Sequence, residues 1–419
     1  MRQRRLENDG FTPANLLKNL LAGLTVAIVA LPLALAFGIG SGLGAQAGLT
    51  TAIIAGALAA IFGGSRLQVS GPTGAMTVIL IPIVASFGPT AILQVGLMAS
   101  GFLALAALFR LGRHIHRLPT SLIEGFTAGI ALVIAMQQVG FLLGVEVKTS
   151  DHIWQSVYLE VQSWITEPKL TPLLLGLFVV LINLFGTNRW PKLPLALLSV
   201  VAATGLANSM NLNLERIGDL PGGIGELNLD FLAAGNWLAL VPAALAVAFL
   251  AGLESLLSAK IADRTSKLEQ HNPDRELLGQ GIANLVVPFF GGVPATAALA
   301  RTAVNVRAGA SSRISAVSHS VFLAMFVLLL SSQISQIPLA ALGGVLIATA
   351  YHMIRIEELK ATASKSRLDG LVLTITLLAT VLLDLISALA IGLLLYLALR
   401  NTKLSNRLVP TDPEETLGD

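Results

Sequence analysis

Two interrupted hydrophobic segments, one in each half of the chain, constrain the fold more than any other feature. Both begin with Phe-Gly-Gly, at residues 62–64 and 290–292, and both continue into Pro- and Thr-containing stretches, at 70–77 and 293–301. A backbone that breaks at membrane depth leaves N–H groups that need partners. Breaks at corresponding positions of two halves are the sequence signature of a transporter binding site. The helix N-termini that they expose favour an anion.

The composition places most of this chain in a lipid bilayer. Of its 419 residues, 54% are hydrophobic and 12% are charged, whereas soluble domains carry about 25% charged residues. The chain contains no cysteine, which excludes a disulfide framework and thiolate chemistry. The six histidines are scattered, and no His/Asp/Glu cluster has the spacing of metal ligands. We therefore expect a membrane protein with no cofactor and no nucleic-acid partner, for which Na⁺ is a candidate coupling ion and not a predicted cofactor.

Fourteen apolar segments follow one another along the chain, seven in each half. Those of the first half lie at about 17–38, 45–62, 72–87, 90–109, 118–144, 171–187 and 193–208. Those of the second half lie at about 236–259, 277–290, 294–306, 313–332, 337–354, 369–383 and 385–400. A full span needs about 20 residues, so the third, tenth, thirteenth and fourteenth segments are predicted to be half-spans or tilted pieces. Seven spans in each half require opposite orientations of the two halves, as in an inverted repeat.

The charges of the loops orient the chain. The predicted inside loops are rich in Lys and Arg, whereas the two large outside loops, at about 145–170 and 209–235, hold three basic and eight acidic residues. This bias follows the positive-inside rule, so we expect both termini in the cytoplasm and the protein in the plasma (inner) membrane. The expected order is a cytosolic segment at 1–13, a first repeat at 14–208, an external connector at 209–235, a second repeat at 236–403 and a cytosolic tail at 404–419.

Thr73 opens the half-helix of the first broken segment. Pro72 suits the first helical position because its ring presets φ and it has no N–H, and Gly71 and Gly74 let a ligand approach the backbone closely. We interpret the N–H groups from Thr73 to Ala75, with the Thr73 hydroxyl, as donors to an anion. The alternative is a helix cap with a buried threonine bonded back to its own helix. The matching break in the other half favours the binding interpretation.

The second half offers a corresponding set of groups. They are Thr296 and the N–H groups of Ala297, Ala298 and Leu299. Arg301 follows them, and a cation just beyond the positive end of a helix deepens the field for an anion. The alternative for Arg301 is a pair with a carboxylate or a side chain that extends to the inner surface, and the sequence leaves both interpretations open.

Glu254 lies about midway along the eighth segment, with Ser255 and Ser258 one and four residues further on. A carboxylate in mid-membrane costs about 3 kcal/mol on insertion scales and is a functional-site candidate by default. Glu254 could bind Na⁺ with the two serine oxygens as further ligands, or it could carry a proton. The alternative is a structural pair with Arg301 or Arg307, and the mid-membrane position favours a function in coupling.

These motifs resemble the sulfate permease family, also called solute carrier family 26. The resemblance rests on the stretch at 30–42 and on the elements at 70–77, 254–263 and 290–307, and it extends over about residues 14–405. It implies an all-α polytopic membrane protein with fourteen segments in two inverted repeats of seven, divided into a core and a gate domain. It also implies short strands before the third and tenth half-helices, an anion site between those half-helices, elevator-like exchange and a homodimer.

Two finer points come from the same resemblance. Most members carry a C-terminal cytosolic STAS domain (sulfate transporter and anti-sigma antagonist), which we expect this chain to lack. The first helix is similar to that of cyanobacterial-type bicarbonate permeases, and Thr73 matches the family's substrate-contacting threonine. The sodium ligands of that branch match Glu254, Ser258 and Leu299 here, and a leucine supplies no ligand oxygen.

The sequence therefore predicts a secondary active transporter of an inorganic anion, with bicarbonate uptake coupled to Na⁺ or H⁺ as the favoured activity. Proton-coupled transport of sulfate or a C4-dicarboxylate fits the same architecture. A nucleobase permease of this plan is expected to place carboxylates on the eighth and tenth segments, whereas the tenth offers Arg301. A membrane-embedded enzyme needs a His/Asp/Glu cluster or a nucleophile with a base. The sequence shows neither, so we do not expect an enzyme.

Overall fold

The computed structural model of this chain is mostly helical. It describes residues 12–113, 119–146, 152–190, 193–220, 223, 225–233, 235, 237–266, 270–383 and 385–401. Nearly all of the predicted N-terminal segment at 1–13 and the whole tail at 404–419 lie outside the described residues.

Helices coincide with every apolar segment predicted from the sequence. The first half contains α2 (Pro13–Gly40), α3 (Ala45–Phe62), β1 (Ser70–Gly71), α4 (Gly74–Phe87), α5 (Thr90–Leu108), α6 (Thr120–Gln137), α7 (Val139–Leu143), α8 (Ile153–Thr166), α9 (Leu170–Arg189) and α10 (Leu195–Ser209). The second contains η2 (Asp230–Ala233), α11 (Val241–Ser266), α12 (Pro273–Val286), η3 (Val287–Phe290), β2 (Thr296–Ala297), α13 (Leu299–Arg307), α14 (Ile314–Ser335), α15 (Leu339–Met353), α16 (Ile356–Ala363), α17 (Arg367–Leu382) and α18 (Leu385–Leu399).

The lengths of these helices bear on how they meet a membrane. Within the described residues, eight helical stretches have the length and apolar character to cross a bilayer. The four segments predicted to be short are short: α4, α13, α17 and α18 have 14, 9, 16 and 15 residues. Two helices, α8 and α16, lie where the sequence predicted only loops. Both alternate apolar and polar side chains with a helical period, a pattern too polar for a search for membrane spans to detect.

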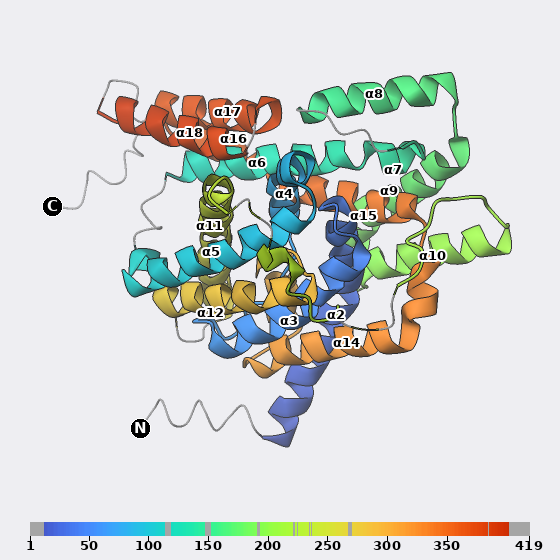
Figure 1. Ribbon diagram of the computed structural model, residues 1–419, viewed down its shortest axis with the longest axis horizontal. Helices are drawn as coiled ribbons and strands as arrows, with labels where there is room; N and C mark the ends of the chain where they lie inside the picture. The colour runs from blue at the N-terminus through green and yellow to red at the C-terminus, as the bar shows by residue number, and fades with distance from the viewer. Residues whose placement is uncertain are drawn as a thin grey trace, which may run out of the picture.

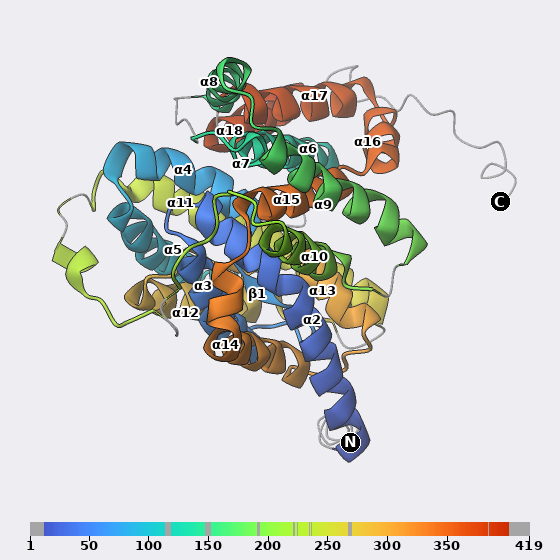
Figure 2. The ribbon, with the colours of Figure 1, turned by 90° about the vertical axis from the view of Figure 1, so that its right-hand side faces the viewer.

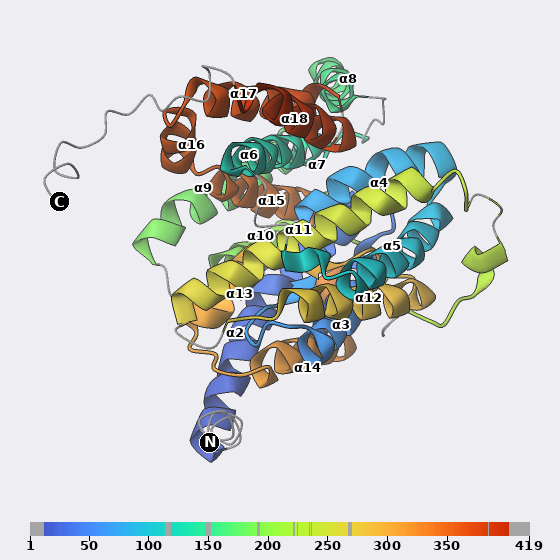
Figure 3. The same ribbon diagram turned by 90° about the vertical axis from the view of Figure 1, so that its left-hand side faces the viewer.

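The helices form two bundles, and each bundle takes helices from both halves of the chain. The first bundle joins α2–α5 with α11–α14, and the second joins α6, α7, α9 and α10 with α15–α18. When each helix is replaced by its counterpart in the other half, the α2–α14 contact becomes α11–α5 and the α3–α14 contact becomes α12–α5. In the same way, α6–α17 becomes α15–α9, and all six contacts are present. Figures 1 and 3 show α6, α17 and α18 at one side of the molecule and α3, α12 and α14 at the other. This paired arrangement agrees with the predicted inverted repeat.

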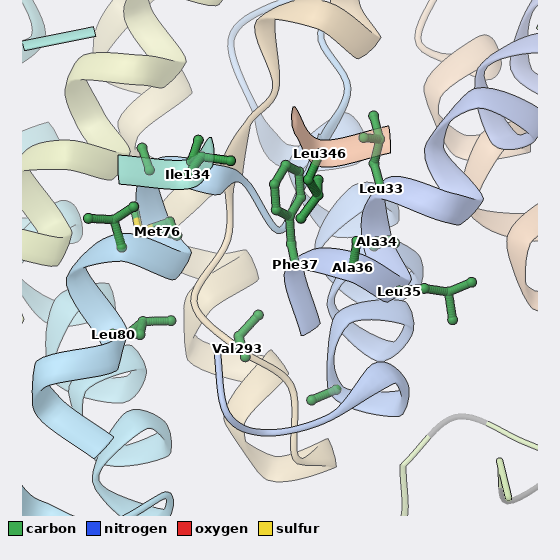
Figure 4. Close-up of a cluster of buried hydrophobic side chains, with 14 of the residues drawn as sticks. Leu33, Ala34, Leu35, Ala36, Phe37, Met76, Leu80, Ile134, Val293 and Leu346 are labelled. Carbon is green, nitrogen blue, oxygen red and sulfur yellow. The ribbon is translucent and has the colours of Figure 1, made fainter. Parts of the chain in front are cut away.

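The two bundles meet along α2 and α4. Helix α2 contacts α10 and α15, and α4 contacts α6, and Figure 2 shows α2 running from the lower bundle up toward α15. The side chains of this contact are apolar: Phe37 of α2, Met76 and Leu80 of α4, Ile134 of α6 and Leu346 of α15 gather in one cluster (Figure 4). An apolar cluster of this kind suits two bodies that shift against each other.

Glu276 of α12 is a buried carboxylate that holds the first Phe-Gly-Gly turn. Its Oε2 accepts the N–H groups of Gly64 and Ser65, both at 2.9 Å, and its Oε1 accepts from the amides of Gln68 and Gln280 at 2.9 and 3.0 Å. A Cβ at Gly64 would overlap the backbone of α12, so glycine is required for this approach. Glu276 thereby fixes the segment that leads into β1.

Replacing Glu276 by alanine is expected to destabilise the first bundle strongly. Four N–H donors lose their carboxylate acceptor, and leaving a buried donor without a partner costs about 1–3 kcal/mol. The melting temperature of the purified protein in detergent measures the effect, with the exposed Glu357→Ala variant of α16 as the matched control. Equal melting temperatures for the two variants would contradict this role.

Candidate functional site

Two short buried strands lie side by side in the first bundle. β1 and β2 pair antiparallel, with Ser70 opposite Ala297 and Gly71 opposite Thr296. Half-helix α4 begins three residues after β1, and α13 begins two residues after β2. The antiparallel pair therefore brings the N-termini of two half-helices from opposite halves of the chain to one place. The strands implied by the resemblance are present where they were expected.

Side chains of neighbouring helices hold the second strand in position. Asn284 of α12 accepts the N–H of Ala295 at 2.7 Å and donates to the carbonyl of the same residue at 2.9 Å. Thr51 of α3 donates to the carbonyl of Val293 at 2.9 Å. These bonds satisfy the backbone groups that a broken membrane segment leaves without helical partners.

At the start of α4, Thr73 has two roles at once. Its hydroxyl accepts the N–H of Met76 at 3.4 Å as a helix cap, and it donates to Oε2 of Glu254 at 3.0 Å. The capping alternative is therefore correct for part of the Thr73 interaction, and the bond to Glu254 of α11 was not expected. The N–H groups of Gly74 and Ala75 fall in the first turn, where a helix provides no acceptor.

At the start of α13, several of the predicted donors already serve the protein. The N–H of Ala297 donates to Ser255 Oγ at 3.2 Å, and that of Ala298 donates to the Val69 carbonyl at 2.9 Å. The Thr296 hydroxyl donates to the carbonyl of Ala251 at 3.0 Å. We therefore move the proposed backbone donors of this half from Ala297 and Ala298 to the first turn of α13. The side chain of Leu299, at the start of that turn, is 37% exposed, so the turn is accessible.

Arg301 stands between the two half-helices rather than at the inner surface. Its side chain is 1% exposed, and its Nη2 donates to the carbonyl of Pro72, which precedes α4. The snorkelling alternative is therefore wrong. The guanidinium of the second half reaches the helix start of the first half and adds a full positive charge to two positive helix ends.

The coupling residues predicted on α11 separate into two groups. Glu254 is half-buried and faces Thr73. Ser255 is fully buried and lies 3.1 Å from the Thr296 hydroxyl, whereas Ser258 donates to the Thr302 hydroxyl at 3.0 Å. The two serines thus connect α11 to β2 and α13. Glu254 is the carboxylate that α11 contributes to the space between the half-helices.

Two apolar side chains that sequence reasoning missed close over the start of α4. A Cβ on Gly74 would meet the ring of Phe37 at 3.1 Å and Cγ1 of Ile134 at 3.0 Å. Phe37 is 7% exposed and Ile134 is 1% exposed. Close packing against these two side chains therefore favours glycine at position 74. No local pattern could identify Ile134, because it comes from the second bundle.

A separate cavity of about 930 Å³ follows the C-terminal half of α4. It is walled by α2, α4, α6, α7, α8 and the ends of α17 and α18, and its lining includes the three carboxylates Glu146, Glu160 and Glu215. Thr73, Glu254 and Arg301 do not line it. The cavity therefore reaches the seam between the bundles from the side of the acidic loops and ends short of the half-helix starts.

This arrangement defines a polytopic transporter in which two inverted halves each contribute one half-helix to a shared site. The chain belongs to the sulfate permease family, whose model matches residues 16–376. Membership, which the resemblance implied, is confirmed. The protein is thus an anion transporter of the membrane and not an enzyme.

Individual relatives agree with this assignment. The protein named "Putative sulfate transporter YvdB" of Bacillus subtilis (strain 168) is 37% identical over 92% of this chain and 74% of its own length. The bicarbonate transporter BicA of Picosynechococcus sp. (strain ATCC 27264 / PCC 7002 / PR-6) is 30% identical over 97% of this chain and 73% of its own. A solved structure, the transmembrane domain of a cyanobacterium bicarbonate transporter BicA, superposes with a TM-score of 0.82 at 31% identity, covering 88% of this chain and 96% of that one.

Proposed function

We propose that this protein takes up bicarbonate and couples its transport to the entry of Na⁺ or H⁺. The observation that carries the proposal is the convergence of two half-helix N-termini, the Arg301 guanidinium and the Glu254 carboxylate on one place. The anion would bind Gly74, Ala75 and the first turn of α13, starting at Leu299. Relatives named as bicarbonate transporters share 30% identity or more with this chain over nearly its whole length.

The charges at the site favour a monovalent anion. Arg301 and Glu254 act on each other electrostatically, and together they carry no net charge. One monovalent anion and one monovalent cation would leave the occupied site neutral, and burying uncompensated charge is costly. With sulfate in place of the monovalent anion, the occupied site would carry one net negative charge. Sulfate transport stays the second candidate, because YvdB carries that name and is 37% identical.

Glu254 is the proposed residue for the coupling ion. It either takes up a proton or binds Na⁺, with Ser255 and Ser258 on the same helix as the further oxygen ligands. Both serines use their hydroxyl groups within the protein, but each oxygen retains a lone pair for a cation. Since Leu299 offers no oxygen, a proton is the simpler occupant.

The remaining features of the proposal follow the predicted topology. The first bundle would carry the anion site as the core domain, and the second would act as the gate domain in an elevator-type movement. The chain would lie in the plasma membrane with both termini in the cytoplasm and would form a homodimer. The repeat boundaries at 14–208 and 236–403, joined by the external connector at 209–235, belong to the same proposal.

Uptake into proteoliposomes tests the proposed substrate and ion together. Labelled bicarbonate, sulfate and fumarate are offered in parallel, each with an inward Na⁺ gradient, with an inward H⁺ gradient and with neither. We expect bicarbonate uptake that rises with one of the two cation gradients. Sulfate or fumarate uptake with bicarbonate inert would overturn the substrate assignment.

Substituting Thr73 by valine is expected to weaken both anion affinity and coupling. Valine keeps the shape but removes the helix cap, which is worth about 1 kcal/mol, and the bond to Glu254. We expect the apparent affinity to fall about fivefold to tenfold, since 1.4 kcal/mol corresponds to a factor of ten. Thr73→Ser should restore it, and Thr90→Val, at the exposed start of α5, is the control. Equal affinities of the valine and serine variants would exclude the hydroxyl from the site.

A further inference from the structure

Two arginines outside the proposed anion site meet at the C-terminal end of α3. Nε of Arg275, in the first turn of α12, donates to the carbonyl of Phe62 at 3.2 Å. Nη1 of Arg313, the N-cap of α14, donates to the carbonyl of Ala60 at 2.7 Å. The two carbonyls belong to the last turn of α3, and α3 contacts both α12 and α14. The two guanidinium groups therefore converge on one helix end from two neighbouring helices.

No carboxylate neutralises this pair of charges. Neither arginine forms an ion pair with an acidic residue in the part of the chain that the structure describes. Arg66, in the turn after α3, and Arg275 both repel Arg313. Glu276 attracts Arg313, but its two oxygens already accept four hydrogen bonds. A single cation complements the negative end of a helix, so this excess of positive charge favours an anionic partner.

Both guanidinium groups keep donors for such a partner. Arg275 uses only Nε of its side chain and Arg313 only Nη1, and their other nitrogens have no acceptor among the described residues. Arg275 is exposed and Arg313 is half-buried, so a ligand can reach the pair from the surface. The planar guanidinium presents paired donors that match the oxygens of a phosphate group.

An apolar stripe continues from each arginine along its own helix. The side chains that follow at intervals of three or four residues are exposed or half-buried, and they are Leu278, Ile282 and Leu285 on α12 and Val317, Val321 and Met325 on α14. Residues at this spacing share one face of a helix. The exposed Ile61 and Phe62 end α3, which contacts both of these helices, and Figures 1 and 3 show the three helices at the same side of the molecule. Charge and apolar surface are thus continuous.

We propose that this surface binds a phospholipid with an anionic headgroup from the inner leaflet. The headgroup phosphate would lie at Arg275 and Arg313, and the acyl chains would follow the stripes of α12 and α14. The loop charges are expected to place these helix ends at the inner surface, where basic pockets between membrane helices bind anionic headgroups. A free phosphate ion would use the arginines alone, whereas a lipid uses the arginines and the stripes. The lipid site is separate from the site at Thr73 and does not depend on which anion is transported.

Native mass spectrometry of the whole chain in detergent tests the proposed lipid. The probes are phosphatidylglycerol and phosphatidylcholine with the same acyl chains. We expect phosphatidylglycerol to bind about tenfold more tightly or better, because two arginines act on its headgroup. Equal affinities for the two lipids would overturn the proposal, and this comparison needs no variant. Displacement of phosphatidylglycerol by inorganic phosphate at the same concentration would show that the arginines bind a free anion, which would overturn the choice of a lipid.

Charge variants test where the lipid binds. Arg275→Gln combined with Arg313→Gln is expected to abolish the preference for phosphatidylglycerol. Lysine at both positions should keep most of the preference, because the charges remain. Arg367→Gln combined with Arg400→Gln is the matched control, since both arginines are exposed and lie at the ends of α17 and α18 in the second bundle. An unchanged preference in the first glutamine pair, or an equal loss in the control pair, would overturn the location. Loss of a dimer in the first pair, with lipid binding unchanged, would assign the surface to a second copy of the chain and would also overturn it.

Discussion

Replacing Glu254 by glutamine is expected to abolish cation-driven accumulation and to preserve exchange of anion for anion. Glutamine has nearly the same shape and can still accept the hydrogen bond from Thr73, but it binds neither a proton nor Na⁺ at physiological pH. With Arg301 alone, the site becomes neutral when a monovalent anion binds and needs no cation to cross. We expect accumulation driven by the Na⁺ or H⁺ gradient to fall about tenfold or more, as expected when more than 1.4 kcal/mol of coupling is lost.

Two transport assays on the same liposomes distinguish this outcome from damage to the protein. Gradient-driven uptake measures coupling, and counterflow of labelled against unlabelled bicarbonate measures movement of the loaded site. Glu167→Gln, at the exposed end of α8, is the control for loss of a carboxylate. Intact gradient-driven uptake in the Glu254 variant would show that another group couples the ion. Loss of both activities would show that the carboxylate is needed for the movement itself.

Replacing Arg301 by glutamine is expected to remove anion binding altogether, in contrast to the Glu254 variant. The substitution leaves Glu254 as the charge at the site, and a second negative charge would then be repelled. Truncating one partner of a buried charged pair costs about 2–5 kcal/mol, so we expect the apparent affinity to fall about 30-fold or more, with 1.4 kcal/mol for each factor of ten. Uptake and counterflow should decline together.

Arg307→Gln is the matched control, because Arg307 lies on the same short helix and its side chain is exposed. Removing that charge should leave affinity within about a factor of two, the usual range for surface substitutions. The double variant of Glu254 and Arg301 adds a further check, since it restores neutrality without the guanidinium. Unchanged affinity in Arg301→Gln would show that the helix N-termini bind the anion without it.

The sequence predicted the scaffold of the site better than its internal bonds. Breaks after Phe-Gly-Gly are local features, and the loss of helical hydrogen bonds at Pro and Gly follows from residue type. The pairing of Ala297 with Ser255 and of Arg301 with Pro72 joins residues far apart in sequence, and one sequence gives no register for such contacts.

The pairing of β1 with β2 also has a consequence for biosynthesis. The two strands are more than 200 residues apart in the chain, and ribosomes add about 5–20 residues each second. For about 10 s or longer, β1 therefore exists in the membrane without its partner, and its backbone groups need a temporary one. Until β2 emerges, β1 has an exposed edge that can pair with another segment. We expect the nascent chain to depend on protection by the insertion machinery during that interval.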